Sequence, residues 1–155
     1  MSMRTDRQIR PAGKTALEQM PSYRLNHIVH QYQQTVQSRL RSVGVSMLKM
    51  RIIMSLRSYG QLTVSELCNH AIAEQPTMSR ALDSLEQQGF VRREQSRVDS
   101  RLRLVTLTDD GRRVGEEIHP VIMEINARMT DGLEPEQREA FSQHLGQILN
   151  NLRTM

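Results

Sequence analysis

The sequence predicts a mostly α-helical protein with one small β-hairpin. Apolar residues recur at helical spacing through most of its 155 residues, and they adopt the alternating period of strands in only one region, after Gly89. No run of apolar residues exceeds three, as in Ile52, Ile53 and Met54. We therefore expect a soluble chain with its own core and with neither a transmembrane helix nor a secretory signal peptide.

Caps and glycines divide most of the chain into six expected helices. Residues 1–21 hold two prolines and lack a helical period, so we expect a flexible basic arm there, with at most one helical turn near Leu17. N-cap residues, among them Ser22 and Ser46, and prolines begin the helices, and glycines end most of them. With their cap and stop residues included, the helices span 22–44, 46–60, 63–70, 76–89, 108–131 and 135–152.

The strongest helix start lies at Thr63. Thr63 and Glu66 have the spacing of a capping box, in which each side chain accepts a hydrogen bond from a free backbone N–H. The next helix places Met78 and Leu82 on one side, which defines its buried face. Its opposite face is polar and consists of Pro76, Thr77, Arg80, Asp83, Ser84 and Gln87, with Ser79 on the flank.

The change of period after Gly89 predicts the hairpin. Residues 90–93 read as a short strand, residues 94–100 are polar and turn-like, and residues 101–107 suit a second strand. Arg97 and Arg101 lie near its tip. A short capped helix, a turn, a second helix and a hairpin together make a winged helix-turn-helix lobe, which we place at residues 45–108.

Positive charge is concentrated at one end of the chain. The net charge is +4, from 21 basic and 17 acidic side chains. Residues 1–60 carry 10 basic and 2 acidic side chains, whereas residues 109–155 carry 5 and 9. Of the 21 cations, 19 are arginine, which suits bidentate contacts to phosphate and guanine. The opposite charge of the two ends suggests that they meet, within one chain or across a dimer.

Two stretches resemble the MarR family of bacterial transcriptional regulators. Residues 99–111 match the family signature D-x-R-x-x-x-V-x-L-T-x-x-G, and residues 76–80, followed by Leu85-Glu86 and Gly89-Phe90-Val91, look like its recognition helix. The helix order fits over residues 22–153. The resemblance implies a homodimer that binds double-stranded DNA at a pseudo-palindromic operator and represses transcription.

The resemblance also assigns roles to segments. Residues 22–44 and 109–155 form the helical dimerisation region, the recognition helix enters the major groove, and the wing reaches the flanking minor groove. A small anionic or aromatic ligand bound between the two regions would release the DNA, and Met47, Met50 and Met54 are candidates to line that pocket.

Particular residues follow from these roles. Arg101 matches the wing arginine of the signature, Asp99 matches the acid that positions it, and Asp83 is expected to hold an arginine such as Arg80. The residues expected to contact DNA are Gln75, Pro76, Thr77, Ser79, Arg80, Ser84, Arg97, Asp99 and Arg101. Those expected at the dimer interface are Leu25, Ile28, Phe141, Leu145, Ile148, Leu149 and Leu152.

Other functions have less support in the sequence. The single cysteine, Cys68, excludes an internal disulfide and indicates a reducing cytoplasm, and we expect it to be a small buried residue rather than a redox sensor. His27 and His30 could share a metal, but no carboxylate lies near them in sequence, so we expect no metal and no cofactor. No catalytic motif is present, which argues against an enzyme. The alternative is a winged-helix module that binds proteins and not DNA, against which the arginines of the wing argue.

Overall fold

A computed structural model describes residues 16–155, so residues 1–15 of the expected basic arm lie outside the described residues. The helical turn expected near Leu17 is present as α1. The helices are α1 (Ala16–Gln19), α2 (Pro21–Arg39), α3 (Met47–Tyr59), α4 (Val64–Ala71), α5 (Gln75–Gln87), α6 (Asp109–Met129) and α7 (Pro135–Arg153), with a 3-10 turn at Arg41–Val43. The strands are β1 (Gln61–Thr63), β2 (Val91–Gln95) and β3 (Arg103–Leu107).

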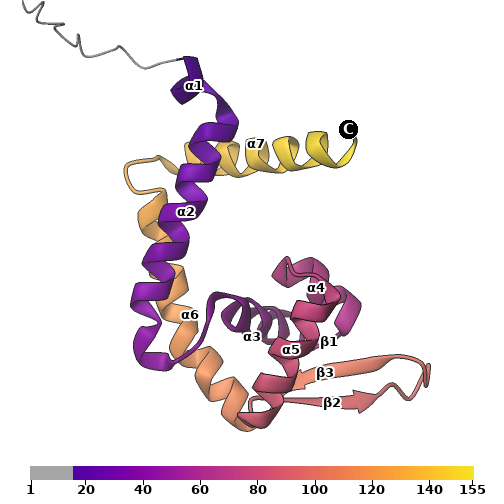
Figure 1. The fold of residues 1–155 in the computed structure, drawn as a ribbon. Coiled ribbons are helices and arrows are strands. Elements are labelled where there is room, and N and C mark those ends of the chain that lie inside the picture. The colour runs from indigo at the N-terminus through magenta and orange to yellow at the C-terminus, as the bar shows by residue number, and fades with distance from the viewer. Residues whose placement is uncertain (1–15) are drawn as a thin grey trace, which may run out of the picture.

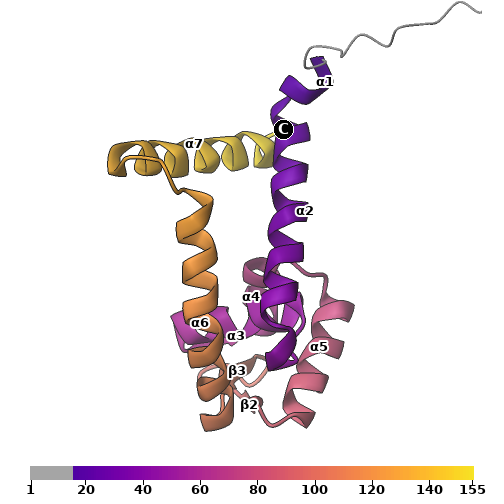
Figure 2. The same cartoon turned by 90° about the vertical axis from the view of Figure 1, so that its left-hand side faces the viewer.

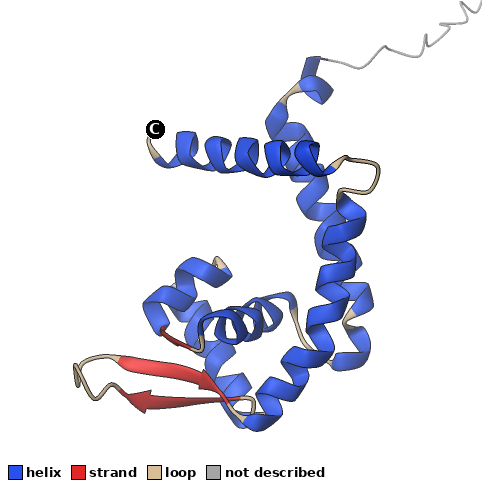
Figure 3. Ribbon diagram, turned by 180° about the vertical axis from the view of Figure 1, so that it is seen from behind, coloured by secondary structure: helices blue, strands red, loops and turns tan. Residues whose placement is uncertain are grey.

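The elements form a small lobe from which two long helices extend. The lobe contains α3, α4, α5 and the strands, and α2 and α6 run side by side away from it (Figure 1). The turned view shows α7 crossing the far ends of these two helices (Figure 2). From behind, α7 and the lobe project to the same side of the α2–α6 pair (Figure 3). The expected helical fold with a winged lobe is confirmed.

The sheet contains one strand more than the expected hairpin. Its order is β1-β3-β2, with both pairs antiparallel. Leu62 of β1 lies opposite Val105 of β3, and Val91 of β2 lies opposite Leu107. A three-residue strand is too short to show a period, and its partner is far away in the sequence, so sequence pattern could not reveal β1.

Most helix caps agree with the sequence, with one exception. Ser46 caps α3 by accepting a hydrogen bond from the Lys49 N–H, and both hydrogen bonds of the Thr63–Glu66 capping box are formed. The expected cap at Ser22 is wrong, because α2 begins at Pro21. The N-cap residue of α2, Met20, makes no side-chain cap hydrogen bond. Pro21 favours a helix start at this position instead, because its ring fixes φ near the helical value.

The core lies in the lobe and continues between α2 and α6. Met78 and Leu82 of α5 are completely buried, as the helical spacing predicted, and Leu85 on the same face is buried as well. Cys68 is half-buried and packs against this core. From α2 and α6 the core takes Val36, Leu40, Ile118 and Ile125, whereas α7 contributes no buried residue. No helix among residues 16–155 has both the length and the apolar character needed to cross a bilayer.

The start of α6 is fitted closely against the end of α5. The Thr108 hydroxyl donates to the Gly89 carbonyl at 2.5 Å, and the Thr108 N–H donates to the Phe90 carbonyl at 3.0 Å. One turn later Gly111 is buried so close to Phe90 that a Cβ on Gly111 would lie 1.9 Å from the Phe90 carbonyl oxygen. A side chain at this position therefore cannot be accommodated without moving backbone.

Replacing Gly111 by alanine should destabilise the fold. The added methyl group meets the Phe90 backbone rather than a flexible side chain, so we expect a loss of about 1–3 kcal/mol in the free energy of unfolding. Gly115→Ala is the matched control, since its Cβ would lie 3.4 Å from Ile53 Cγ2, which is an ordinary contact. Urea unfolding of both variants measures the difference, and equal stability for the two would contradict the close fit.

Candidate nucleic-acid interface

The polar face of α5 is open to solvent. The N-cap residue Glu74 makes no side-chain cap hydrogen bond. Pro76 has no N–H, so the N–H groups of Gln75 and Thr77 are the ones available to an anion such as phosphate. The Arg80 Nε atom donates to the Pro76 carbonyl at 3.2 Å, so the guanidinium group points toward the N-terminal end of α5. Exposed on this face are the expected DNA-contacting residues Gln75, Pro76, Thr77, Ser79 and Arg80.

Ser84 lies apart from these residues. It is half-buried, and its hydroxyl accepts a hydrogen bond from Lys49 Nζ at 2.7 Å. The same ammonium group donates to Gln88 Oε1 at 2.7 Å. Lys49 therefore fastens the last turns of α5 to α3, and Ser84 faces this contact rather than the open side of the helix.

The tip of the wing is an ordered turn. The Ser96 hydroxyl accepts hydrogen bonds from the N–H groups of Val98 and Asp99 at 3.2 and 3.3 Å. Asp99 Oδ1 accepts a hydrogen bond from the Arg101 backbone N–H at 2.9 Å. The aspartate thus holds Arg101 through its backbone and not through its guanidinium group, and both Arg101 and Arg97 are exposed.

The arginines of the wing fall into two groups. Arg92 pairs with Glu94 at 3.1 Å, and Arg93 pairs with two carboxylates of α5. Within residues 16–155, no carboxylate lies within ion-pair distance of the exposed arginines Arg97, Arg101 and Arg103. These three guanidinium groups can meet the phosphates or bases of a nucleic acid without first breaking an internal ion pair.

Asp83 holds Arg93 and not Arg80, which corrects the sequence expectation. Arg93 Nη2 lies 2.7 Å from Asp83 Oδ1 and 2.5 Å from Glu86 Oε2. The hydrogen bond from Arg93 also lowers the pKa of the Glu86 carboxyl. The sequence does contain a signal for this contact, because two acids lie one helical turn apart and an arginine lies on the following strand. Which arginine pairs with the acids, however, depends on the direction in which the chain runs from α5 into β2.

Two clefts lie between α2 and the lobe, and Arg51 lines both. The larger measures about 600 Å³ and reaches the start of α5 at Glu74 and Thr77. The other, about 290 Å³, is bordered by Tyr32, Met50, Met54, Tyr59, His70 and Ile122. Met47 lines the first cleft and Met50 and Met54 the second. Arg51 Nη1 donates to the Ala71 carbonyl at 3.2 Å, at the end of α4.

The residues expected at a dimer interface lie on α2 and α7. Leu25 and Ile148 are half-buried, and the others are exposed, including Leu149 at 50% and Phe141 at 42%. An apolar groove of about 410 Å³ runs between α2, α6 and α7 and is lined mainly by Ile28, Tyr32, Ile125, Met129 and Phe141. The apolar stripes of α2 and α7 are therefore not covered by the described part of this chain.

The two histidines of α2 take part in local contacts. The His27 ring packs against the Tyr23 ring with centroids 4.4 Å apart and planes tilted by 45°, and a His30 ring nitrogen lies 2.9 Å from Gln34 Nε2. Among residues 16–155 no group of three or more His, Cys, Asp and Glu side chains is arranged to hold a metal ion.

Comparison with known proteins gives a consistent result. Residues 45–102 match the family model described as MarR family. A solved structure of a MarR-family transcriptional regulator from Silicibacter pomeroyi is 34% identical, covers 94% of this chain and 99% of that one, and has a TM-score of 0.82. The HTH-type transcriptional repressor IacR of Pseudomonas putida is 26% identical over 89% of this chain and 83% of the repressor. A variant of MarR from Escherichia coli, complexed with operator DNA, shares the fold with a TM-score of 0.71 and 24% identity, covering 84% of this chain and 94% of that one.

Acid should weaken the contact between the wing and α5. Arg93 holds the pKa of Glu86 below its ordinary value of 4.5, so ionised Glu86 stabilises the folded state above about pH 4.5, and this contribution is lost as the pH falls through the lowered pKa. We expect Glu86→Gln to be less stable than the wild type at neutral pH, and the difference to shrink below about pH 4.5. Urea unfolding across this range measures it, and a difference that stays constant down to about pH 3 would contradict the linkage.

Proposed function

Because the chain belongs to the MarR family of transcriptional regulators, we propose that it is a sequence-specific repressor that acts as a homodimer on a pseudo-palindromic operator. It is a transcriptional regulator and not an enzyme. The DNA-bound relative and the repressor IacR support the two finer parts of this proposal, since their names state operator binding and repression. The remaining support comes from this chain's own surface.

The observation that carries DNA binding is the combination of α5 and the wing. α5 presents a polar face with its helix start open, and the neighbouring hairpin presents Arg97, Arg101 and Arg103 without carboxylate partners in the described chain. An α-helix fits the major groove, where base edges can be read, and arginine suits the potential of a narrow minor groove. One lobe thus offers an element for each groove.

A second copy of this chain is the proposed occupant of the apolar stripes on α2 and α7. The 19-residue helix α7 has no buried residue, although its apolar side chains share one stripe. The groove between α2, α6 and α7 continues that apolar surface. Residues 1–60 are net basic and residues 109–155 are net acidic. The basic end of one copy therefore attracts the acidic end of the other across a two-fold axis. A two-fold dimer places two lobes on two half-sites.

We also propose regulation by a small aromatic anion. The smaller cleft offers the rings of Tyr32, Tyr59 and His70 together with the guanidinium of Arg51, which suits an aromatic carboxylate. Arg51 also holds the Ala71 carbonyl, at the turn between α4 and α5. A ligand that draws Arg51 away from this carbonyl would disturb the turn that places α5.

The two DNA-reading elements should fail differently when altered. Arg80→Ala should weaken binding to the operator more than to random DNA, by about 1–3 kcal/mol of discrimination. Arg101→Ala should weaken the operator and reduce any preference for A/T-rich flanks, and Asp99→Ala should do the same more mildly because the charge remains. Competition binding uses duplexes selected from a randomised pool by the wild type. A module that binds proteins and not DNA would select no duplex from the pool. If Arg101→Ala leaves the affinity and the flank preference unchanged, the wing does not read DNA.

The homodimer proposal predicts that α7 is essential for assembly. Deleting residues 135–155 should leave an aggregated or monomeric protein that does not bind the operator, because the apolar stripe of α7 is lost. Leu149→Glu tests the same surface without removing the helix. Gln143→Glu, on the polar side of α7 opposite the apolar stripe, is its control. Sedimentation analysis reports the mass of each. A well-folded monomer that binds the operator would overturn the proposal.

The ligand proposal predicts a thermal shift that depends on Arg51. Aromatic carboxylates that prefer the folded state should raise the melting temperature of the wild type, and the shift should grow with the logarithm of the ligand concentration once this exceeds the dissociation constant. The shift should disappear in Arg51→Gln, while Arg57→Gln, on the same helix and outside both clefts, should keep it. Calorimetric melting of the three proteins measures this, and a carboxylate whose shift survives in Arg51→Gln would place the ligand elsewhere.

A further inference from the structure

Arg93 connects the wing to α5 through several hydrogen bonds at once. Its Nη2 atom lies 2.7 Å from Asp83 Oδ1 and 2.5 Å from Glu86 Oε2, and its Nε atom lies 3.1 Å from the same Glu86 oxygen. The Arg93 backbone N–H donates to the other Glu86 oxygen at 3.3 Å. The side chain is only 21% exposed. The Nε and Nη2 groups of Arg93 are therefore already bound to carboxylates, unlike the guanidinium groups of the arginines at the wing tip.

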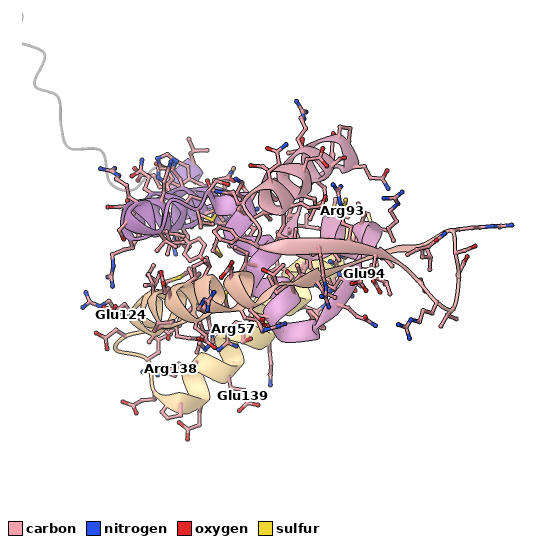
Figure 4. All side chains as sticks on the ribbon, turned by 90° about the horizontal axis from the view of Figure 1, so that it is seen from below. Arg57, Arg93, Glu94, Glu124, Arg138 and Glu139 are labelled. Atoms are coloured by element: carbon pink, nitrogen blue, oxygen red, sulfur yellow. The ribbon has the colours of Figure 1, made fainter. Side chains whose placement is uncertain are left out.

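The strand places Arg93 and its neighbour on opposite faces of the hairpin. Successive residues of a strand alternate between faces, and Figure 4 shows Arg93 toward α5 and Glu94 on the other side. Glu94 pairs with Arg92 at 3.1 Å, and both side chains of that pair are more than 60% exposed. The hairpin thus contains two arginine–carboxylate contacts, one that reaches α5 and one that stays within β2.

The two carboxylates stand where negative charge opposes DNA binding. Within α5 the ionisable side chains are Arg80, Asp83 and Glu86, so the helix has a net charge of −1 before Arg93 is counted. Phosphates repel acids on a surface that approaches DNA. The presence of both acids on α5 is therefore unfavourable on charge alone, and their benefit has to come from what they hold.

We propose that Arg93, Asp83 and Glu86 form a positioning cluster that sets the angle between the recognition helix and the wing, and that Arg93 acts without touching DNA. The inference rests on the proposed DNA binding. The planar guanidinium spans two carboxylates that are three residues apart on one helix. It therefore limits how far the hairpin can tilt against α5, as well as the distance between β2 and this helix.

This geometry matters because α5 and the wing have to engage adjacent grooves at the same time. Buried Met78, Leu82 and Leu85 hold α5 against the lobe, and the cluster adds a polar contact between α5 and β2 beyond the short connection through Gly89 and Phe90. Without this contact the hairpin can tilt relative to α5, and each misaligned orientation loses contacts in one groove. The cluster removes this freedom before DNA arrives, so less order has to be gained on binding.

The change in DNA affinity caused by Glu86→Gln has opposite signs for a positioning role and for a pure charge effect, so its direction distinguishes the two. A pure charge effect would tighten binding to any DNA, because the variant loses one negative charge. Positioning predicts the opposite for specific DNA: Glu86→Gln and Asp83→Asn should each weaken the wild-type-selected duplex about tenfold relative to a random duplex of equal length. Arg93→Ala should lose at least as much, and Arg93→Lys should be intermediate, since an ammonium cannot bridge both acids in one plane.

The second contact of the hairpin supplies matched controls. Glu94→Gln removes a carboxylate paired with an arginine of the same strand, and Arg92→Ala removes its partner. Neither reaches α5, so both should leave the ratio of selected to random affinity unchanged. Circular dichroism at the temperature of the assay confirms that each variant is folded, and a variant that merely loses stability should keep the wild-type ratio once folded.

Four results would decide against the inference or its basis. If Glu86→Gln and Asp83→Asn tighten both duplexes as Glu94→Gln does, the acids act by charge alone. If Arg93→Ala weakens both duplexes equally and lowers the salt slope by about one, Arg93 contacts a phosphate. A wild type that selects no duplex refutes the proposed function itself, whereas a binding wild type with unchanged ratios in these variants refutes only the positioning role.

Discussion

The junction of α5, β2 and α6 is the constraint on which the arrangement of this molecule depends. Thr108 binds the carbonyls of both Gly89 and Phe90, and Gly111 packs directly on Phe90. The end of the helix with the polar face, the base of the wing and the start of the long helix that leaves the lobe are therefore fixed to one another within a few residues. Whatever moves α6 must also move the surface that we assign to DNA.

Much of the local structure could be predicted because its causes are local. The Thr63–Glu66 capping box, the Ser46 cap and the buried face of α5 each depend on residues within a few positions of one another, and all are present. The strand β1 and the partner of Asp83 could not be predicted in the same way. Each depends on which distant segment the fold brings alongside, and periodicity carries no information about that.

The arginine content of the wing does not by itself show which of its arginines are available to a ligand. Together the arginines of the wing argue for DNA binding, but carboxylates of α5 and β2 engage two of them, Arg92 and Arg93. The arginines left without such partners in the described chain lie at the tip and on β3. The hairpin is therefore divided along its length into a base that holds the lobe together and an outer part that is open to a ligand.

The absence of any buried residue in α7 has a thermodynamic consequence. An isolated helix of this length is marginal in water, because its stability comes mainly from packing of its apolar face. In the proposed dimer that packing is supplied by the partner, so forming α7 and forming the dimer are a single event. The amount of intact regulator then varies with the concentration of the chain itself, since each tenfold dilution costs a dimer about 1.4 kcal/mol. Control over how much of this protein is made would thus also be control over how much of it is folded.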